Sequence, residues 1–173
     1  MRRKEERIMN RQMLKAPAAL LLAFLMVAAI TSGALAEQKV RLPESSYYLM
    51  IPDGMEYDGP GTSPDDARFA YVSASLGLEI QFFCQPNDKG VSLQAMAEVL
   101  VGDGIETSIH RINGMEMIVY QTEDPGDAPG KGMKCIGYVL EDGNKVQMIC
   151  FWYATQEAAD RTAEIISSIT NGD

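Results

Sequence analysis

Two dipeptides, Asn113-Gly114 and Asp142-Gly143, constrain the fold of this 173-residue chain more than any other feature. Both tolerate the positive φ angles of a two-residue type I′ turn, and each separates two runs of strand-forming residues. The flanking strands are expected at Ile105–Ile112, Met115–Thr122, Met133–Glu141 and Asn144–Tyr153. The sequence therefore predicts two antiparallel hairpins in the second half of the chain.

The hairpin around Asp142-Gly143 is apolar on both faces. One face is expected to hold Cys135, Gly137, Val139, Val146, Met148, Cys150 and Trp152, and the other Ile136, Tyr138, Leu140, Ile149 and Phe151. Because neither face can be left in water, both need a covering layer. The simplest solution is a mainly antiparallel sheet with a helix on each face, an α/β/α sandwich of the α+β class.

Two segments with helical periodicity can supply the covering helices. The first, Leu93–Val101, follows a natural N-cap, Ser92, and is stopped by Gly102. The second, Thr155–Ile169, carries its apolar residues on one face. Shorter strands are expected earlier in the chain, at Tyr47–Ile51, Arg68–Ala74 and Leu76–Gln85.

The expected turn also brings two of the three cysteines together. With Asp142 and Gly143 as the turn residues, Cys135 faces Cys150 in a hydrogen-bonded pair, whose Cα atoms lie about 5.5 Å apart. That separation permits a disulfide, but Cβ atoms at such sites lie at the wide end of ~4.5 to 5.5 Å, and a relaxed bridge prefers ~3.8 Å. Cys135 and Cys150 are the candidate disulfide, both redox states remain open, and Cys84 is expected to be a free, buried thiol.

The first 36 residues have the pattern of a secretory signal peptide. A basic segment precedes the apolar run Leu20–Ile30, and Ala34-Leu35-Ala36 is a small-residue cleavage site. The alternative is a retained single-pass anchor, although the apolar run is shorter than the ~20 residues of a spanning helix. We expect cleavage between Ala36 and Glu37, no lipid anchor because Glu37 is not cysteine, and a mature chain with no membrane span that is secreted or periplasmic.

Cleavage would leave a single acidic domain, residues 37–173. The segment removed contains 6 of the 15 Lys and Arg residues and 2 of the 24 Asp and Glu residues, which leaves 9 basic and 22 acidic residues and a net charge of −13. Such a chain repels nucleic acid and anionic lipid. We therefore expect no nucleic-acid partner.

The order of these elements resembles the PsbP-like superfamily over about residues 47–170. The shared features are a strand closing in Ile51-Pro52-Asp53-Gly54, a helix begun by Ser92-Leu93, the two hairpins, and a last helix ending in Ser167-Ser168-Ile169-Thr170. That superfamily includes an extrinsic protein of photosystem II and DcrB-like bacterial envelope proteins. The resemblance implies a non-enzymatic domain that binds or stabilises partners, with no cofactor and no catalytic residue.

The residues themselves offer few candidates for chemistry. His110, the only histidine, is expected opposite Met117 as a packed side chain, without the partners of a triad or a metal site. The segment Gly126–Gly132 imitates a phosphate loop without its spacing or following helix. Asp58, Asp65 and Asp66 lack the spacing of a calcium loop. The segment Gly126–Gly132 and the three aspartates are therefore predicted to be solvated loop residues rather than binding sites.

Aromatic residues near strand ends offer a further candidate. A ligand platform is conceivable there, although core and rim packing explains the same residues equally well: Tyr47, Tyr48, Trp152 and Tyr153.

Two functional hypotheses follow from the sequence. The first is a secreted, cofactor-free binding or accessory protein of the bacterial cell exterior, whose partner is an unknown protein or envelope ligand. The alternative is a small secreted hydrolase or metal-dependent enzyme, for which His110 and the acidic loops are the only support.

Overall fold

A computed structural model describes residues 37–60, 67–123 and 132–172. The expected signal peptide, the loop with Asp65 and Asp66, and most of the phosphate-loop imitation lie outside the described residues. Among the helices that are described, none is long and apolar enough to cross a membrane.

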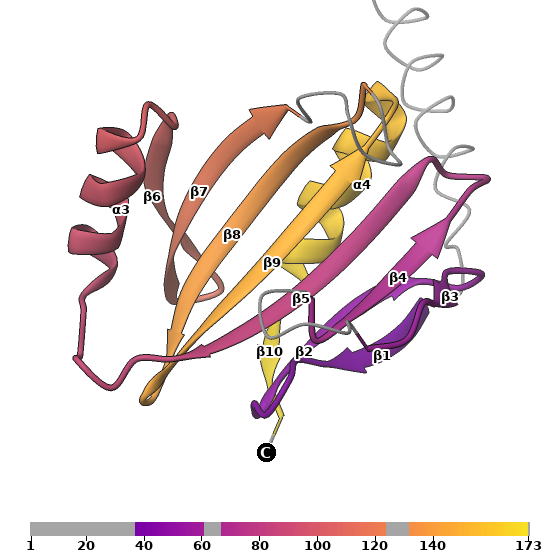
Figure 1. Cartoon of the computed structure of the whole chain (residues 1–173). Helices are drawn as coiled ribbons and strands as arrows, with labels where there is room; N and C mark the ends of the chain where they lie inside the picture. Colours follow the sequence, from indigo (N-terminus) through magenta and orange to yellow (C-terminus); the bar gives the residue numbers. More distant parts are fainter. Residues whose placement is uncertain (1–36, 61–66, 124–131, 173) are drawn as a thin grey trace, which may run out of the picture. The chain divides into compact units, whose positions relative to one another are not determined.

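The centre of the domain is a seven-stranded antiparallel sheet, in the order β3-β4-β5-β9-β8-β7-β6 (Figure 1). Both predicted hairpins belong to this sheet. Its strands are β3 (Glu56–Tyr57), β4 (Phe69–Ser73), β5 (Leu78–Pro86), β6 (Thr107–Ile112), β7 (Met115–Glu123), β8 (Lys134–Asp142) and β9 (Lys145–Tyr153).

The turn between β6 and β7 is the predicted one. Ile112 pairs with Met115, and both turn residues have positive φ, 48° at Asn113 and 83° at Gly114. This is the combination that a type I′ turn requires. His110 consequently lies opposite Met117, as expected.

The turn between β8 and β9 differs from the prediction by one residue. Asp142 stays in the strand and pairs with Lys145, so that the turn residues are Gly143 and Asn144. Of the predicted pair only Gly143 has positive φ, 65°, and glycine at the first turn position is the signature of a type II′ turn. Asp142 is held in place because its carboxylate accepts a hydrogen bond from Gln147 Nε2 at 3.1 Å.

The corrected register moves the two cysteines out of direct opposition. Cys135 faces Trp152, and Cys150 faces Gly137. The prediction that Cys135 faces Cys150 is therefore wrong. The strand partner of Cys135 shifts by two residues, from Cys150 to Trp152. Because side chains alternate between faces with a period of two, the two cysteines still lie on the same face, as diagonal neighbours.

One face of the large sheet is covered by two elements. The helix α4 (Gln156–Ser167) begins where Thr155 Oγ1 accepts from the Ala158 amide, and its residues Ala158, Ile165 and Ile166 are buried. Beside it lies a three-stranded sheet in the order β1-β2-β10. Its strands are β1 (Glu37–Arg41), β2 (Tyr47–Pro52) and β10 (Thr170–Asn171).

The strand predicted at Tyr47–Ile51 therefore belongs to a second sheet, because Leu49 and Ile51 pack onto the large sheet instead of extending it. Leu49 and Ile51 form the main core together with buried residues of α4 and of the large sheet. Its largest fully buried side chains include Phe82, Phe151, Leu140, Ile149 and Ile80.

The other face carries the helix α3 (Leu93–Gly102). Ser92 caps it as predicted, accepting from the Ala95 amide at 3.3 Å. Ala97 packs against Ile118 and Val139 in a second, smaller core. The α+β class, the mainly antiparallel sheet and a helix on each face are thus confirmed.

Candidate functional site

The two faces of the large sheet are covered to different extents. The helix α3 contacts β6, β7 and β8, at one end of the sheet (Figure 1). On the same side of β4, β5 and β9, no described element covers the strands. We call this region the open sheet face and define it by the side chains of Arg68, Val72, Glu79, Gln81, Phe83 and Trp152, which are exposed or half-buried.

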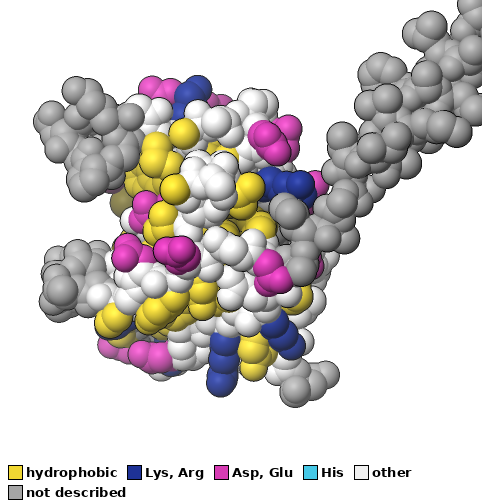
Figure 2. Space-filling model, turned by 90° about the vertical axis from the view of Figure 1, so that its right-hand side faces the viewer, with side chains coloured by type: hydrophobic (Ala, Val, Ile, Leu, Met, Phe, Trp, Pro, Cys, Tyr) yellow, Lys and Arg dark blue, Asp and Glu magenta, His cyan; other side chains and the backbone are white. Residues whose placement is uncertain are grey.

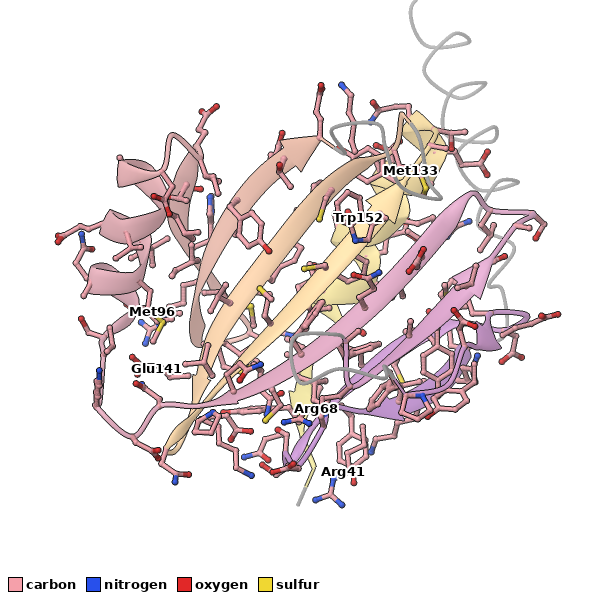
Figure 3. All side chains as sticks on the ribbon, in the orientation of Figure 1. Arg41, Arg68, Met96, Met133, Glu141 and Trp152 are labelled. Atoms are coloured by element: carbon pink, nitrogen blue, oxygen red, sulfur yellow. The ribbon has the colours of Figure 1, made fainter. Side chains whose placement is uncertain are left out.

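A short chain of hydrogen bonds crosses the open sheet face. The indole Nε1 of Trp152 donates to Gln81 Oε1 at 3.2 Å, and Gln81 Nε2 donates to Glu79 Oε1 at 2.7 Å. Trp152 lies directly opposite Glu79 in the register of β9 and β5. The Gln81 amide therefore fixes the half-buried indole of Trp152 (Figure 3).

Apolar and basic side chains complete this surface. Val72 lies opposite Glu79, Phe83 follows Gln81 on the same face of β5, and both are half-buried. Arg68 is exposed just before β4 begins, and Figure 3 shows it well away from Trp152. An aromatic ring with a polar handle, beside half-buried apolar side chains, is the composition of a recognition surface. Chemically, this arrangement is suited to binding a partner.

Three sulfur atoms lie at the border between the open sheet face and the part covered by α3. Tyr120 Oη is 3.3 Å from both Cys150 Sγ and Met148 Sδ, and Cys135 lies on the same face of the sheet as a diagonal neighbour of Cys150. All three cysteines are free and buried. The candidate disulfide Cys135–Cys150 remains a prediction, now for a diagonal pair.

The electrostatics of the pair are asymmetric. The hydrogen bond from Cys135 lowers the pKa of Cys150, with a smaller contribution from Tyr120. The hydrogen bond to Cys150 and burial together raise the pKa of Cys135, and burial raises that of Tyr120.

Gly137 makes room for the Tyr120 ring. A β-carbon at position 137 would overlap the ring carbons and the hydroxyl of Tyr120. The absence of a side chain on β8 thus lets Tyr120 reach across that strand to the sulfur atoms of β9.

His110 is not the packed side chain that was expected. It is exposed, because β6 is the edge strand of the sheet, and its Nε2 lies 2.8 Å from Ser108 Oγ. The prediction of a hydrogen-bonded histidine is met, whereas that of a packed one is wrong. Sequence reasoning missed Ser108, although its i and i+2 spacing from His110 in a strand was a usable signal.

Cys84 is buried as predicted, and burial raises its pKa. It receives a hydrogen bond from Gln147 Nε2 at 3.6 Å, on the core side of the sheet. A thiol in that state is a poor nucleophile.

The four candidate platform aromatics do not converge. Tyr47 and Tyr48 lie in β2, Trp152 lies on the open sheet face, and Tyr153 points to the opposite, core side. The Lys39 ammonium instead lies over the ring of Tyr48, 4.1 Å from the ring centroid.

Another aromatic group, Tyr57, Phe69 and Tyr71, lies at the β3 and β4 edge. Figure 2 views the domain from this side, where hydrophobic side chains alternate with acidic and basic ones.

Among the described residues no group of three His, Cys, Asp or Glu side chains could hold a metal ion. Asp58 is exposed. Asp65 and Asp66, with the residues of the phosphate-loop imitation before Gly132, lie outside the described part of the chain.

Comparison with known proteins places the fold. The sequence matches no known family and no curated protein. The structure is similar to the solution structure of cyanobacterial PsbP (CyanoP) from Synechocystis sp. PCC 6803, with a TM-score of 0.56 and 10% identity over 82% of this chain and 95% of that one.

A crystal structure from Bacteroides thetaiotaomicron VPI-5482 is also similar, with a TM-score of 0.55 and 12% identity over 79% of this chain and 48% of that one. The chain thus has a PsbP-like fold, as the resemblance in its element order predicted.

Proposed function

We propose that this protein is a secreted or periplasmic, cofactor-free binding or accessory protein of the bacterial cell exterior, and that it contacts a protein partner through the open sheet face. The observation that carries the proposal is the half-buried Trp152, fixed by Gln81 on a part of the sheet that no described element covers.

The composition of the surface supports a protein as the partner. Tryptophan is enriched at the energetic centres of protein interfaces, and Trp152 occurs here with the apolar side chains of Phe83 and Val72. Because the indole is already held by Gln81, ordering it on binding costs little conformational entropy. The negative charge of residues 37–173 argues against nucleic acid as the partner.

The test compares two aromatic substitutions in the full-length secreted protein. Immobilised wild type, Trp152→Ala and Tyr57→Ala are exposed to the supernatant and the solubilised surface proteins of the producing cells. Tyr57 is the control because it is 57% exposed and lies outside the open sheet face. We expect one protein to be retained by wild type and Tyr57→Ala, with affinity at least about tenfold lower for Trp152→Ala.

Two results would contradict the proposal. One is that no protein is retained by folded wild-type protein in repeated captures from either source. The other is that a retained protein binds Trp152→Ala as tightly as wild type, since the open sheet face would then not be its contact surface.

The alternative, a small secreted hydrolase, is supported by one contact, the 2.8 Å hydrogen bond between Ser108 Oγ and His110 Nε2. Such a pair is the nucleophile and base of a serine hydrolase when a third group orients the histidine. Labelling with a fluorophosphonate probe tests it, with Ser108→Ala as the control. Stoichiometric labelling that Ser108→Ala abolishes would favour the enzyme, and the absence of labelling would exclude this pair as its nucleophile.

A further inference from the structure

The strand β6 forms one edge of the large sheet (Figure 1). Its four central residues, 108–111, are all exposed. The strand at the opposite edge, β3, is two residues long, whereas β6 has six residues and contains neither proline nor lysine. Short length, proline and lysine are common means by which natural proteins prevent pairing at a sheet edge. β6 therefore has the features of an edge that pairs with a further strand.

The register of the β6–β7 hairpin shows which backbone groups of β6 point outward. A two-residue turn closes with a hydrogen-bonded pair, here Ile112 and Met115, and hydrogen-bonded pairs then alternate along the ladder. The amides and carbonyls of Thr107, Ile109 and Arg111 consequently point away from β7. Within the described ranges, these outward groups make no backbone hydrogen bond. They form a regular row of three donors and three acceptors.

Exposed apolar side chains occur at the same end of the sheet. Ile109 of β6 is 39% exposed, and Val99 and Val101 of α3 are 63% and 58% exposed. The Ile109 side chain lies on the face that α3 covers, because Ile109 is opposite Ile118, which packs against Ala97 of α3. Exposed apolar surface beside an unpaired strand is typical of a protein interaction site.

We propose that the protein forms a symmetric homodimer, in which β6 pairs antiparallel with β6 of a second copy about a two-fold axis at Ile109. In this register Ile109 faces its own counterpart, and Thr107 faces Arg111 of the second copy. All of these are hydrogen-bonded pairs, so that every outward donor and acceptor of β6 is satisfied. β6 contains no acidic residue, although residues 37–173 carry a net charge of −13, so two copies meet along a strand without repelling carboxylates.

Hydrogen bonding and charge both select this register. An axis shifted by one residue along the strand would place Thr107 or Arg111 opposite a residue outside β6, and outward groups would lose their partners. An axis at His110 would also make the two Arg111 side chains diagonal neighbours. With the axis at Ile109 they lie four residues apart along the strands, about 13 Å at ~3.3 Å per residue, which exceeds the Debye length of about 8 Å.

The symmetry has a consequence for the open sheet face. Because the axis of such a pair is perpendicular to the sheet, both open sheet faces lie on the same side of one continuous sheet. If the proposed function is correct, the dimer presents two copies of Trp152 toward the same side and can bind a repetitive partner bivalently. The dimer itself does not depend on that function, since its contacts are made by β6 and not by β4, β5 or β9.

The first experiment measures the mass of the full-length secreted protein by sedimentation equilibrium over a wide range of concentrations. Wild type should be a dimer. Ile109→Pro removes only an outward N–H, which an edge strand tolerates, and should weaken the dimer at least about tenfold. Ile109→Lys places two ammonium groups opposite each other and should be monomeric. Tyr57→Lys is the matched control, because Tyr57 is an exposed aromatic residue on the opposite edge strand, and it should remain a dimer.

A second experiment tests the register by cross-linking, and it decides even where Ile109→Lys fails to fold. Under mild oxidation Ile109→Cys should give a disulfide-linked dimer, because Cα atoms of a hydrogen-bonded pair lie about 5.5 Å apart. Thr107→Cys should not, since the two copies of that position lie four residues apart. Wild type, whose three cysteines are buried, is the blank.

Three results would overturn the proposal. The first is wild-type protein that stays monomeric at every concentration, as expected if β6 pairs only with a strand of another protein. The second is a dimer that folded Ile109→Lys leaves intact. The third is cross-linking of Thr107→Cys as efficient as that of Ile109→Cys, because the axis would then not lie at Ile109.

Discussion

Asn113, at the tip of the β6–β7 hairpin, donates a hydrogen bond from its side-chain Nδ2 to the main-chain oxygen of Ile169 at 3.0 Å. The same amide nitrogen donates to Ser167 O at 2.7 Å. Ser167 is the last residue of α4, so its carbonyl has no partner within the helix, and Ile169 follows the C-cap Ser168. Asn113 thus has two roles: it forms the turn of one hairpin, and its side chain binds backbone carbonyls at and just after the end of α4.

The two purposes of Asn113 can be separated by two substitutions. Asn113→Gly keeps the positive φ of 48° and loses the two hydrogen bonds, so we expect a loss of about 1 kcal/mol in the free energy of unfolding. Asn113→Ala also forces a side chain into the left-handed region, which adds about 1 to 2 kcal/mol. Urea denaturation measures both values. Equal stability of the two variants would show that the side chain alone matters.

The contact between Gly137 and Tyr120 predicts that the effect of Gly137→Ala on stability depends on the residue at position 120. Gly137→Ala should destabilise the protein by about 1 to 3 kcal/mol, because the new methyl group meets the Tyr120 ring. In a Tyr120→Ala background the same change should be neutral or slightly stabilising, because glycine is unfavourable within a strand. Unfolding free energies of the four proteins form a double-mutant cycle. Additive effects would contradict the contact.

The ion pair between Glu44 Oε2 and Lys145 Nζ, 2.9 Å apart, predicts a pH dependence. The hydrogen bond and charge of Lys145 lower the pKa of Glu44 below its usual 4.5. The stabilisation that the ionised Glu44 gives the folded protein is therefore fully present above pH 4.5. It is lost as the pH falls through the lowered pKa of Glu44.

We expect wild type to be slightly more stable than Glu44→Gln near neutral pH and the two to converge in acid. Because Glu44 is exposed and Lys145 is only half-buried, about 1 M salt should reduce the difference. Chemical denaturation over a pH series measures it. A difference that grows as the pH falls below 4.5 would contradict the assigned pKa direction.

The expected cleavage between Ala36 and Glu37 is tested by the intact mass of the protein recovered from the cell exterior. A mass that corresponds to residues 37–173 is the expected result. A product that retains the apolar run Leu20–Ile30 would mean that the segment serves as an anchor.

The sequence by itself determined the types of the main elements. Alternation with a period of two placed the side chains of β8 and β9 on two apolar faces, which required a covering layer on each side. The Asn113-Gly114 turn was predictable because few residue pairs accept two positive φ angles. The capped starts of α3 and α4 were equally local signals.

The tertiary structure alone decided where each layer lies along the sheet. Nothing in the sequence around α3 says that it covers β6 to β8 and leaves Trp152 on the open sheet face, because helix packing depends on side chains distant in sequence. The turn at Gly143-Asn144 was decided likewise, since Asp142 is kept in β8 by Gln147. The diagonal placement of Cys135 and Cys150 follows from that single long-range choice of register.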